Sequence, residues 1–170
     1  EFETPDRGIN TYNTADFRIA VFGQGNIGTH TVSTDSKYSQ IAARLIRGPI
    51  RKPYATAIGI DKAGMTLGDY GAILDEIKGN HAPDVIVVAI KPDSHDAKQR
   101  LDWAGALAGE GNFVICVVER FDHLAQTPAI VLENENVIIV DPLTEFQAYK
   151  GSGLLTWADN AEIWAPQAHA

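Results

Sequence analysis

The sequence predicts a single α/β domain built around a doubly wound parallel sheet. Two observations favour this fold: short apolar runs alternate with amphipathic stretches, and a glycine-rich turn follows directly on the first apolar run. Strands buried on both faces of a parallel sheet are apolar in this way, and crossover helices separate them. We therefore expect a Rossmann-like domain over residues 16–150, after a flexible arm at 1–15 and before a packing or dimerisation tail at 151–170.

Five apolar runs supply the expected strands. FRIAVF at 17–22 ends at the glycines, YATAIGI at 54–60 ends at an aspartate, and DVIVVAI at 84–90 is the clearest buried strand in the chain. The runs at 113–118 and 137–140 complete the sheet. The fourth run carries Cys116, for which we expect a buried and inert thiol.

Four stretches between these runs have helical spacing. Apolar side chains share one face over 36–46, 69–77 and 96–108, and Asp93 or Ser94 is expected to cap the last of these helices; the stretch 121–132 is expected to be helical despite an internal proline. Since the first helix begins well after the glycines, the glycine loop is expected to be extended over 31–36.

Size and composition narrow the class of protein. The chain has 170 residues, 45% of them hydrophobic and 21% charged, which is typical of a soluble globular domain. A net charge of −8 argues against binding to nucleic acid or to an anionic membrane, and no apolar run is long enough to span a bilayer. A single cysteine excludes an intramolecular disulfide and a cysteine metal cluster and is typical of a cytoplasmic protein, which we therefore expect. No spacing of histidine, aspartate and glutamate resembles a strong metal site, so we expect no bound metal.

The turn after the first strand has the spacing of a phosphate-binding loop. The residues are Gly23-Gln24-Gly25-Asn26-Ile27-Gly28, a G-x-G-x-x-G pattern. The first glycine allows a tight turn, the second lets the backbone approach a pyrophosphate, and the third lets a helix pack against the strand. All six residues are therefore predicted to bind a dinucleotide. The alternative is a glycine-rich turn without a ligand.

Asp61 follows the second strand, where an acid accepts hydrogen bonds from the adenosine ribose. Its negative charge would repel a 2′-phosphate, so we expect NAD rather than NADP as the cofactor, although Lys62 beside it is able to accommodate a phosphate. The alternative is a carboxylate in a solvent-exposed turn.

The loop after the third strand is a second part of the predicted cofactor site, because ligands of such sheets bind at the carboxyl ends of the strands. Ile90, Lys91, Pro92 and His95 lie there, and we expect them beside the nicotinamide half of the dinucleotide. His95 is also a candidate catalytic residue. Its alternative role is that of a surface histidine at a helix start.

The loop after the fourth strand holds the remaining catalytic candidates, Glu119, Arg120 and His123. Histidine suits general acid–base catalysis, whereas arginine stays protonated and would only hold an anion or a substrate hydroxyl. Glu119 and Asp141 are expected to point into the same crevice. Solvated strand-end acids and an exposed loop histidine are the alternatives.

Four stretches carry a family resemblance: GQGNIGTH at 23–30, DYGAILD at 69–75, DVIVVAIKPDSH at 84–95 and GNFVIC at 111–116. They are similar to the glycine loop, the helix before the third strand, the Pro-x-x-His loop and the fourth strand of the Gfo/Idh/MocA family of NAD(P)-dependent oxidoreductases. The resemblance implies a cofactor-binding Rossmann domain and hydride transfer to or from a sugar-like or hydroxy substrate near Lys91 and His95.

The chain departs from that family in two places. The family continues its fourth strand into Glu-Lys-Pro, whose Lys is catalytic, but here the candidates are Val117-Val118-Glu119 or, shifted by two residues, Glu119-Arg120-Phe121. The family also has a substrate-binding second domain, whereas only the tail 151–170 follows here.

Three functions therefore stay open. The first is an oxidoreductase that takes its pocket for an unknown small-molecule substrate from a partner subunit or a dimer mate. The second is a non-catalytic nucleotide-binding sensor or regulatory subunit, and the third is a structural or interaction protein that has lost the cofactor. A homo-oligomer is expected, with Trp157 and Trp164 of the tail as candidate anchors.

Overall fold

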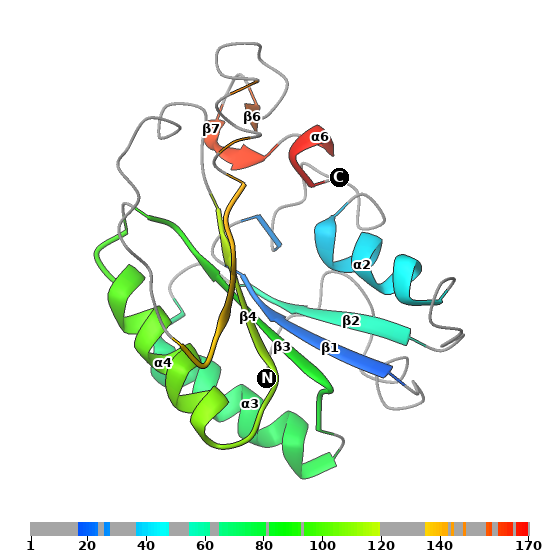
Figure 1. The fold of residues 1–170 in the computed structure, drawn as a ribbon, viewed down its shortest axis with the longest axis vertical. Helices are drawn as coiled ribbons and strands as arrows, with labels where there is room; N and C mark the ends of the chain where they lie inside the picture. The colour runs from blue at the N-terminus through cyan, green and yellow to red at the C-terminus, as the bar shows by residue number, and fades with distance from the viewer. Residues whose placement is uncertain are drawn as a thin grey trace.

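The computed structural model contains an α/β domain with a five-stranded parallel sheet (Figure 1). The described residues are 17–23, 26–27, 37–47, 55–61, 65–80, 82–92, 94–119, 135–142, 144, 148, 156–157, 160–164 and 166–169. The predicted arm at 1–15, the loop 31–36 and the helix at 121–132 lie outside them.

The sheet confirms the predicted fold class. Its strands are β1 (Phe17–Phe22), β2 (Ala55–Ile60), β3 (Val85–Ile90), β4 (Val114–Val118) and β5 (Ile138–Val140), all parallel and in the order β2-β1-β3-β4-β5. The chain runs from β1 to β2 on one side and then returns to place β3 on the other side of β1. This reversal makes β1 and β3 the topological switch point, where ligands of open α/β sheets bind.

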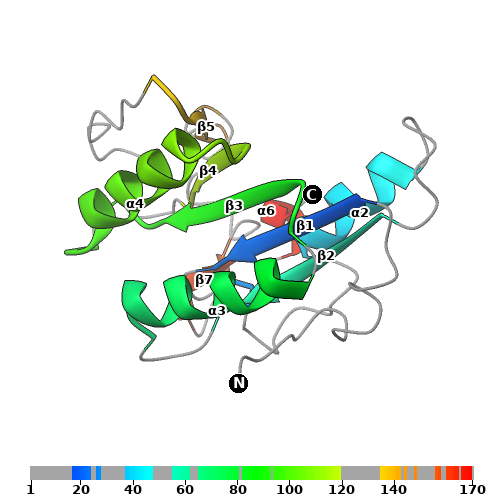
Figure 2. The same cartoon turned by 90° about the horizontal axis from the view of Figure 1, so that it is seen from below.

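Helices cover both faces of the sheet. Figure 1 shows α3 (Leu67–Asn80) and α4 (Ala97–Gly109) on one side and α2 (Tyr38–Arg47) on the other, and Figure 2 shows the sheet from below with its twist. Right-handed crossovers require this division, because the connection from β1 to β2 runs in the opposite direction to those that lead to β3 and β4.

The core is divided by the sheet into two apolar clusters. On the side of α3 and α4, the strands contribute Phe22, Ile60 and Val88, and on the side of α2 they contribute Val21 and Val87. Adjacent strand residues face opposite sides, which is why the fully apolar runs of the sequence supply both clusters.

An aromatic group anchors the larger cluster. The ring of Phe22 meets the rings of Tyr70 and Trp103 edge to face, with centroids 5.3 Å and 5.2 Å apart. Cys116 lies in the same cluster with no exposed surface, and burial raises the pKa of its thiol to about 12. The thiol is therefore buried as predicted and stays protonated at neutral pH.

Local hydrogen bonds set the ends of the helices. Thr66 and Asp69 form a capping box at the start of α3, in which the backbone N–H and the hydroxyl of Thr66 donate to Asp69 Oδ2 over 2.8 and 2.9 Å. The prediction that Ser94 caps α4 was wrong: its hydroxyl donates to the carboxylate of Asp96, which stands at the N-cap without a side-chain capping bond. The alternative cap, Asp93, lies outside the described residues.

Gly111 ends α4 in a Schellman motif. The N–H of Gly111 donates to the carbonyl of Ala108 over 3.0 Å, and that of Asn112 donates to the carbonyl of Leu107 over 3.3 Å. Gly111 has a φ of 94°, a conformation that glycine adopts without strain. The helix therefore ends at the glycine that follows its C-cap.

The tail forms a small hairpin and a short helix. Strand β6 (Thr156–Trp157) pairs antiparallel with β7 (Asn160–Trp164), and α6 (Pro166–His169) follows. His169 is buried against the start of α2. The role of Trp157 and Trp164 as anchors in an oligomer stays a prediction. Among the helices that the structure describes, none is both long enough and apolar enough to cross a membrane.

Candidate functional site

The turn after β1 leaves no room for a side chain at its first residue. The N–H of Gly23 donates to the carbonyl of Ile60 over 2.9 Å, which holds the turn against the end of β2. A Cβ atom on Gly23 would lie 2.5 Å from Asp61 Oδ2 and 2.8 Å from Ile27 Cβ. Only glycine fits this position, as the predicted role of the first glycine requires.

Asp61 braces this turn from the end of β2. Its Oδ2 accepts a hydrogen bond of 3.1 Å from the backbone N–H of Ile27, and the side chain is only 8% exposed. The alternative of a solvent-exposed turn carboxylate is therefore wrong. A carboxylate accepts several hydrogen bonds at once, so bracing the turn and accepting a ribose hydroxyl are compatible roles.

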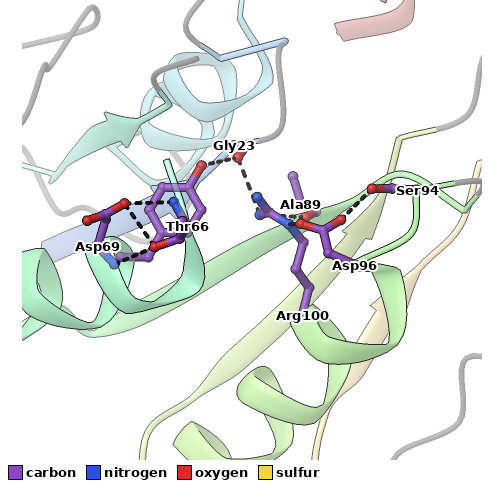
Figure 3. Close-up of polar contacts among 8 residues, drawn as sticks. Gly23, Thr66, Asp69, Ala89, Ser94, Asp96 and Arg100 are labelled. Carbon is purple, nitrogen blue, oxygen red and sulfur yellow. Dashed lines mark hydrogen bonds and ion pairs between the residues drawn. The ribbon is translucent and has the colours of Figure 1, made fainter. Parts of the chain in front are cut away.

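Two side chains support the turn from the α3 and α4 side (Figure 3). The hydroxyl of Tyr70 donates to the carbonyl of Gly23 over 2.9 Å, and Nη1 of Arg100 lies 3.5 Å from the same oxygen and 3.5 Å from the carbonyl of Ala89. Burial raises the pKa of Tyr70, so the hydroxyl keeps its proton and donates it. These contacts hold the carbonyl of Gly23 in place from the α3 and α4 side of the sheet.

Arg100 is a buried cation with compensating partners. Its guanidinium lies 5.0 Å from the centre of the Tyr70 ring, and its Nε pairs with Asp96 Oδ2 over 3.1 Å. Asp96 stands one helical turn before Arg100, which makes this an i, i+4 pair. The Asp96 carboxylate offsets the charge of this buried guanidinium, which lies on the α3 and α4 side of the glycine turn.

Replacing Tyr70 with phenylalanine is expected to lower the free energy of unfolding by about 1–2 kcal/mol, because the buried carbonyl of Gly23 loses its closest side-chain donor while the ring packing is kept. Urea unfolding followed by circular dichroism measures the change. The same substitution at Tyr38 serves for comparison, since that hydroxyl makes a longer contact of 3.4 Å. An equal or larger loss at Tyr38 would contradict the assigned support of the turn.

A second set of contacts joins the glycine turn to the end of β4. Nδ2 of Asn26 donates to Oε2 of Glu119 over 2.6 Å, and both side chains are fully buried. The hydroxyl of Tyr38 approaches Oε1 of the same carboxylate at 3.4 Å. The predicted loop residue and the predicted strand-end acid are therefore brought together, but they bind each other.

The environment of Glu119 favours its neutral form. Burial, followed by the negative charge of Asp61, raises the pKa of Glu119 to about 7, while Asn26, Lys91 and Tyr38 act in the opposite direction. Near neutral pH this side chain is therefore able both to donate and to accept a proton. The alternative of a solvated strand-end acid is wrong for Glu119.

The tail packs against the N-terminus of α2. The backbone N–H of Tyr38 donates to Nδ1 of His169 over 3.2 Å, and the two rings stack with centroids 5.7 Å apart. Burial and the nearby charge of Lys37 lower the pKa of His169 to about 4, so the ring is neutral and its Nδ1 accepts. Lys37, which is also buried, donates to the carbonyl of Ile27.

The predicted residues after β3 lie in different surroundings. The side chain of Ile90 packs in the core, and its carbonyl accepts the N–H of Glu119 over 2.8 Å. Pro92 is buried, Lys91 is half-buried, and His95 is exposed in the turn before α4. Ile90 therefore contacts the site residue Glu119 only through its backbone carbonyl. Lys91 contributes a positive charge near the Glu119 carboxylate.

Some predicted site residues fall outside the described part of the chain. These are Gln24, Gly25, Gly28, Arg120 and His123. Asp141 is exposed whereas Glu119 is fully buried, so the two acids do not share a crevice as predicted, and Asp141 matches the alternative of a solvated strand-end acid. Within the described ranges, no group of three or more histidine, cysteine, aspartate or glutamate side chains is placed to hold a metal ion.

Five residues of this region were not predicted from the sequence: Lys37, Tyr38, Tyr70, Arg100 and His169. Tyr70 lies on the apolar face expected over 69–77, but that pattern does not predict the contact of its hydroxyl with Gly23. Arg100 lies four residues before Ala104, which faces the core. An arginine on an apolar helical face with an acid one turn earlier is a detectable signal of a buried ion pair. No sequence pattern pairs Tyr38 with His169.

The described residues thus form a site at the carboxyl ends of β1, β2 and β4. It has a sterically restricted glycine turn, an acid that braces the turn, and a buried acid that contacts it from the opposite side. Comparisons of the chain with protein-family models, with curated proteins and with solved structures find no match.

Proposed function

We propose that this chain binds NAD at the carboxyl ends of β1, β2 and β3. The observation that carries the proposal is the contact between the glycine turn and Asp61. A Cβ on Gly23 would lie 2.5 Å from the Asp61 carboxylate, so the turn and the acid form one close-packed unit. This arrangement suits a dinucleotide, because the glycine turn lets the backbone approach the pyrophosphate while the acid beside it accepts the ribose hydroxyls.

The charges of the site favour NAD over NADP. Asp61 follows β2 and is held in place by Ile27, so a 2′-phosphate would meet a fixed negative charge. The proposal includes a cytoplasmic, reducing location, with which the buried free thiol of Cys116 is compatible. It also includes a homo-oligomeric assembly.

A non-catalytic role in nucleotide binding is the second candidate, and one observation favours it. Glu119, at the place where the resembled family has Glu-Lys-Pro, is fully buried and bonded to Asn26. A catalytic acid must reach its substrate. An oxidoreductase that takes its substrate pocket from a partner subunit is the other reading, and turnover of NAD with hydroxy substrates distinguishes the two.

Calorimetric titration with NAD⁺, NADH, NADP⁺ and NADPH tests the proposal. We expect binding of NAD⁺ and NADH, weaker binding of the phosphorylated forms, and a loss of about 10- to 100-fold in NAD affinity for Asp61→Ala, since a hydrogen bond to a charged acceptor is removed. Gly25→Leu should abolish binding.

Two further variants distinguish the role of Asp61 in binding the nucleotide from its role in holding the glycine turn. Asp61→Asn keeps an oxygen for the N–H of Ile27 but removes the charge, so it should narrow the preference for NAD over NADP. Gly71→Ala, on α3, has open space around the added Cβ and should bind as the unaltered chain does. Absence of binding by all four nucleotides would refute the proposal.

A further inference from the structure

The bond between Asn26 and Glu119 joins two strand ends that are not neighbours. Asn26 follows β1, Glu119 directly follows β4, and β3 lies between these strands in the sheet. The connection therefore crosses beside the carboxyl end of β3, at the switch point of the fold. It lies on the side that α2 covers, because Tyr38 of α2 reaches the same carboxylate.

The sheet leaves space for this crossing. Val85 and Val87 of β3 belong to the cluster on the α2 side, so the alternation of the strand places Ala89 on that side as well. Ala89 is fully buried and carries only a methyl group, which lets the longer side chains of Asn26 and Glu119 meet next to it. A larger residue at position 89 would hinder the contact.

His169 of the tail holds Tyr38 in the position from which it contacts Glu119. The ring of Tyr38 is stacked on His169, and the N–H of Tyr38 is bound to His169 Nδ1. Together the stacking and the hydrogen bond fix the position from which the Tyr38 hydroxyl reaches Glu119. A series of contacts consequently runs from α6 through Tyr38 and Glu119 to Asn26 of the glycine turn.

We propose that Asn26, Glu119 and Tyr38 form a latch that closes the nicotinamide half of the site while leaving the adenosine diphosphate half accessible. The inference rests on the proposed function. A dinucleotide extends across the switch point from the β1 turn toward the ends of β3 and β4, where this latch lies. The adenosine diphosphate half needs only the turn and Asp61. The resting chain therefore accepts ADP, and the nicotinamide half binds when the contacts to Glu119 open.

The latch makes a prediction about the relative affinities of two ligands. In the unaltered chain, ADP should bind at least as tightly as NAD⁺, because the cost of opening the latch offsets the favourable interactions of the nicotinamide half. Tyr38→Phe and Glu119→Ala remove hydrogen bonds of the latch, so each should improve the affinity for NAD⁺ relative to that for ADP. The expected change is about tenfold for Glu119→Ala, which loses the 2.6 Å bond to Asn26, and smaller for Tyr38→Phe, whose hydroxyl contact is 3.4 Å long.

The experiment is calorimetric titration of the full chain and of each variant with ADP and with NAD⁺. Tyr38→Phe keeps the ring that stacks on His169, and Glu119→Gln keeps an acceptor for Asn26, so it should retain the latch and the original ratio of affinities. Asp75→Ala removes an exposed acidic charge from α3 and serves as the control for net charge. Hydrogen exchange of the Ile27 amide shows whether the turn is intact in each variant.

Each result distinguishes the two proposals. An affinity ratio that shifts toward NAD⁺ in Tyr38→Phe and Glu119→Ala, but not in Glu119→Gln or Asp75→Ala, supports the latch. ADP binding with the same ratio in all variants overturns the latch and leaves nucleotide binding standing. Failure of both ADP and NAD⁺ to bind to the unaltered chain overturns both.

Discussion

Replacing Gly23 with alanine is expected to lower the free energy of unfolding by about 3 kcal/mol. The added Cβ would lie 2.5 Å from Asp61 Oδ2, 2.8 Å from Asp61 Cγ and 2.8 Å from Ile27 Cβ. Neither neighbour is able to retreat, because Ile27 is fully buried and Asp61 is held by the N–H of Ile27. The turn must therefore open, which separates β1 from the end of β2.

Urea unfolding followed by circular dichroism measures this loss, and Gly71→Ala provides the matched control. Gly71 lies inside α3 with no atom within 4 Å of an added Cβ, so alanine there should stabilise the fold by about 1 kcal/mol through helix propensity. The two substitutions add the same methyl group, but their expected changes in the free energy of unfolding have opposite signs. Equal stabilities for the two variants would contradict the steric account of the turn.

The double variant with Asp61→Ala identifies the source of the cost. The Asp61 carboxylate is the group that an added Cβ would approach most closely, so Gly23→Ala should cost less in the Asp61→Ala background than in the unaltered chain. A coupling free energy of about 1–2 kcal/mol is expected for residues in direct contact. Additive losses would instead assign the cost to the contact of the added Cβ with Ile27.

Most of the fold was predictable because strands buried on both faces leave a strong signal. The apolar runs ending at Phe22, Ile60, Ile90 and Val118 each became a strand with nearly the expected bounds. The start of α3 was less predictable. Its first turn contains Gly68 and Asp69, two residues that disfavour helix interiors, and the helix begins at Leu67 because Thr66 caps it.

The contacts between the predicted site residues were less predictable than their positions at the ends of the strands. The glycine turn and the strand-end acids follow from local patterns, and the structure brings Asn26, Asp61 and Glu119 to the same edge of the sheet. That Asn26 meets Glu119 depends on the strand order, since the two residues are 93 positions apart. The contact between Tyr38 and His169 spans 131 positions and depends on where the tail folds back. Local sequence patterns carry no information about contacts between residues so far apart in the chain.

The second large effect concerns pH. The pKa of Glu119 is raised from 4.5 to about 7 in the folded chain, chiefly by burial, so between these values the folded state holds a proton that the unfolded state releases. The free energy of unfolding should therefore fall as the pH rises through this range, by about 3 kcal/mol, and should change little from this cause above it. Glu119→Gln removes the titration while keeping an acceptor for Asn26.

Measuring the difference between Glu119→Gln and the unaltered chain isolates this effect. His169 acts in the opposite direction, because its pKa is lowered to about 4 and protonation of the unfolded state reduces stability as the pH falls below 6.5. That contribution is the same in both proteins and cancels in the difference. The advantage of Glu119→Gln should grow by about 3 kcal/mol between pH 4 and pH 8. Parallel stability curves for Glu119→Gln and the unaltered chain would mean that the carboxylate ionises as easily in the folded chain as in the unfolded one, and the buried contact with Asn26 would then need another explanation.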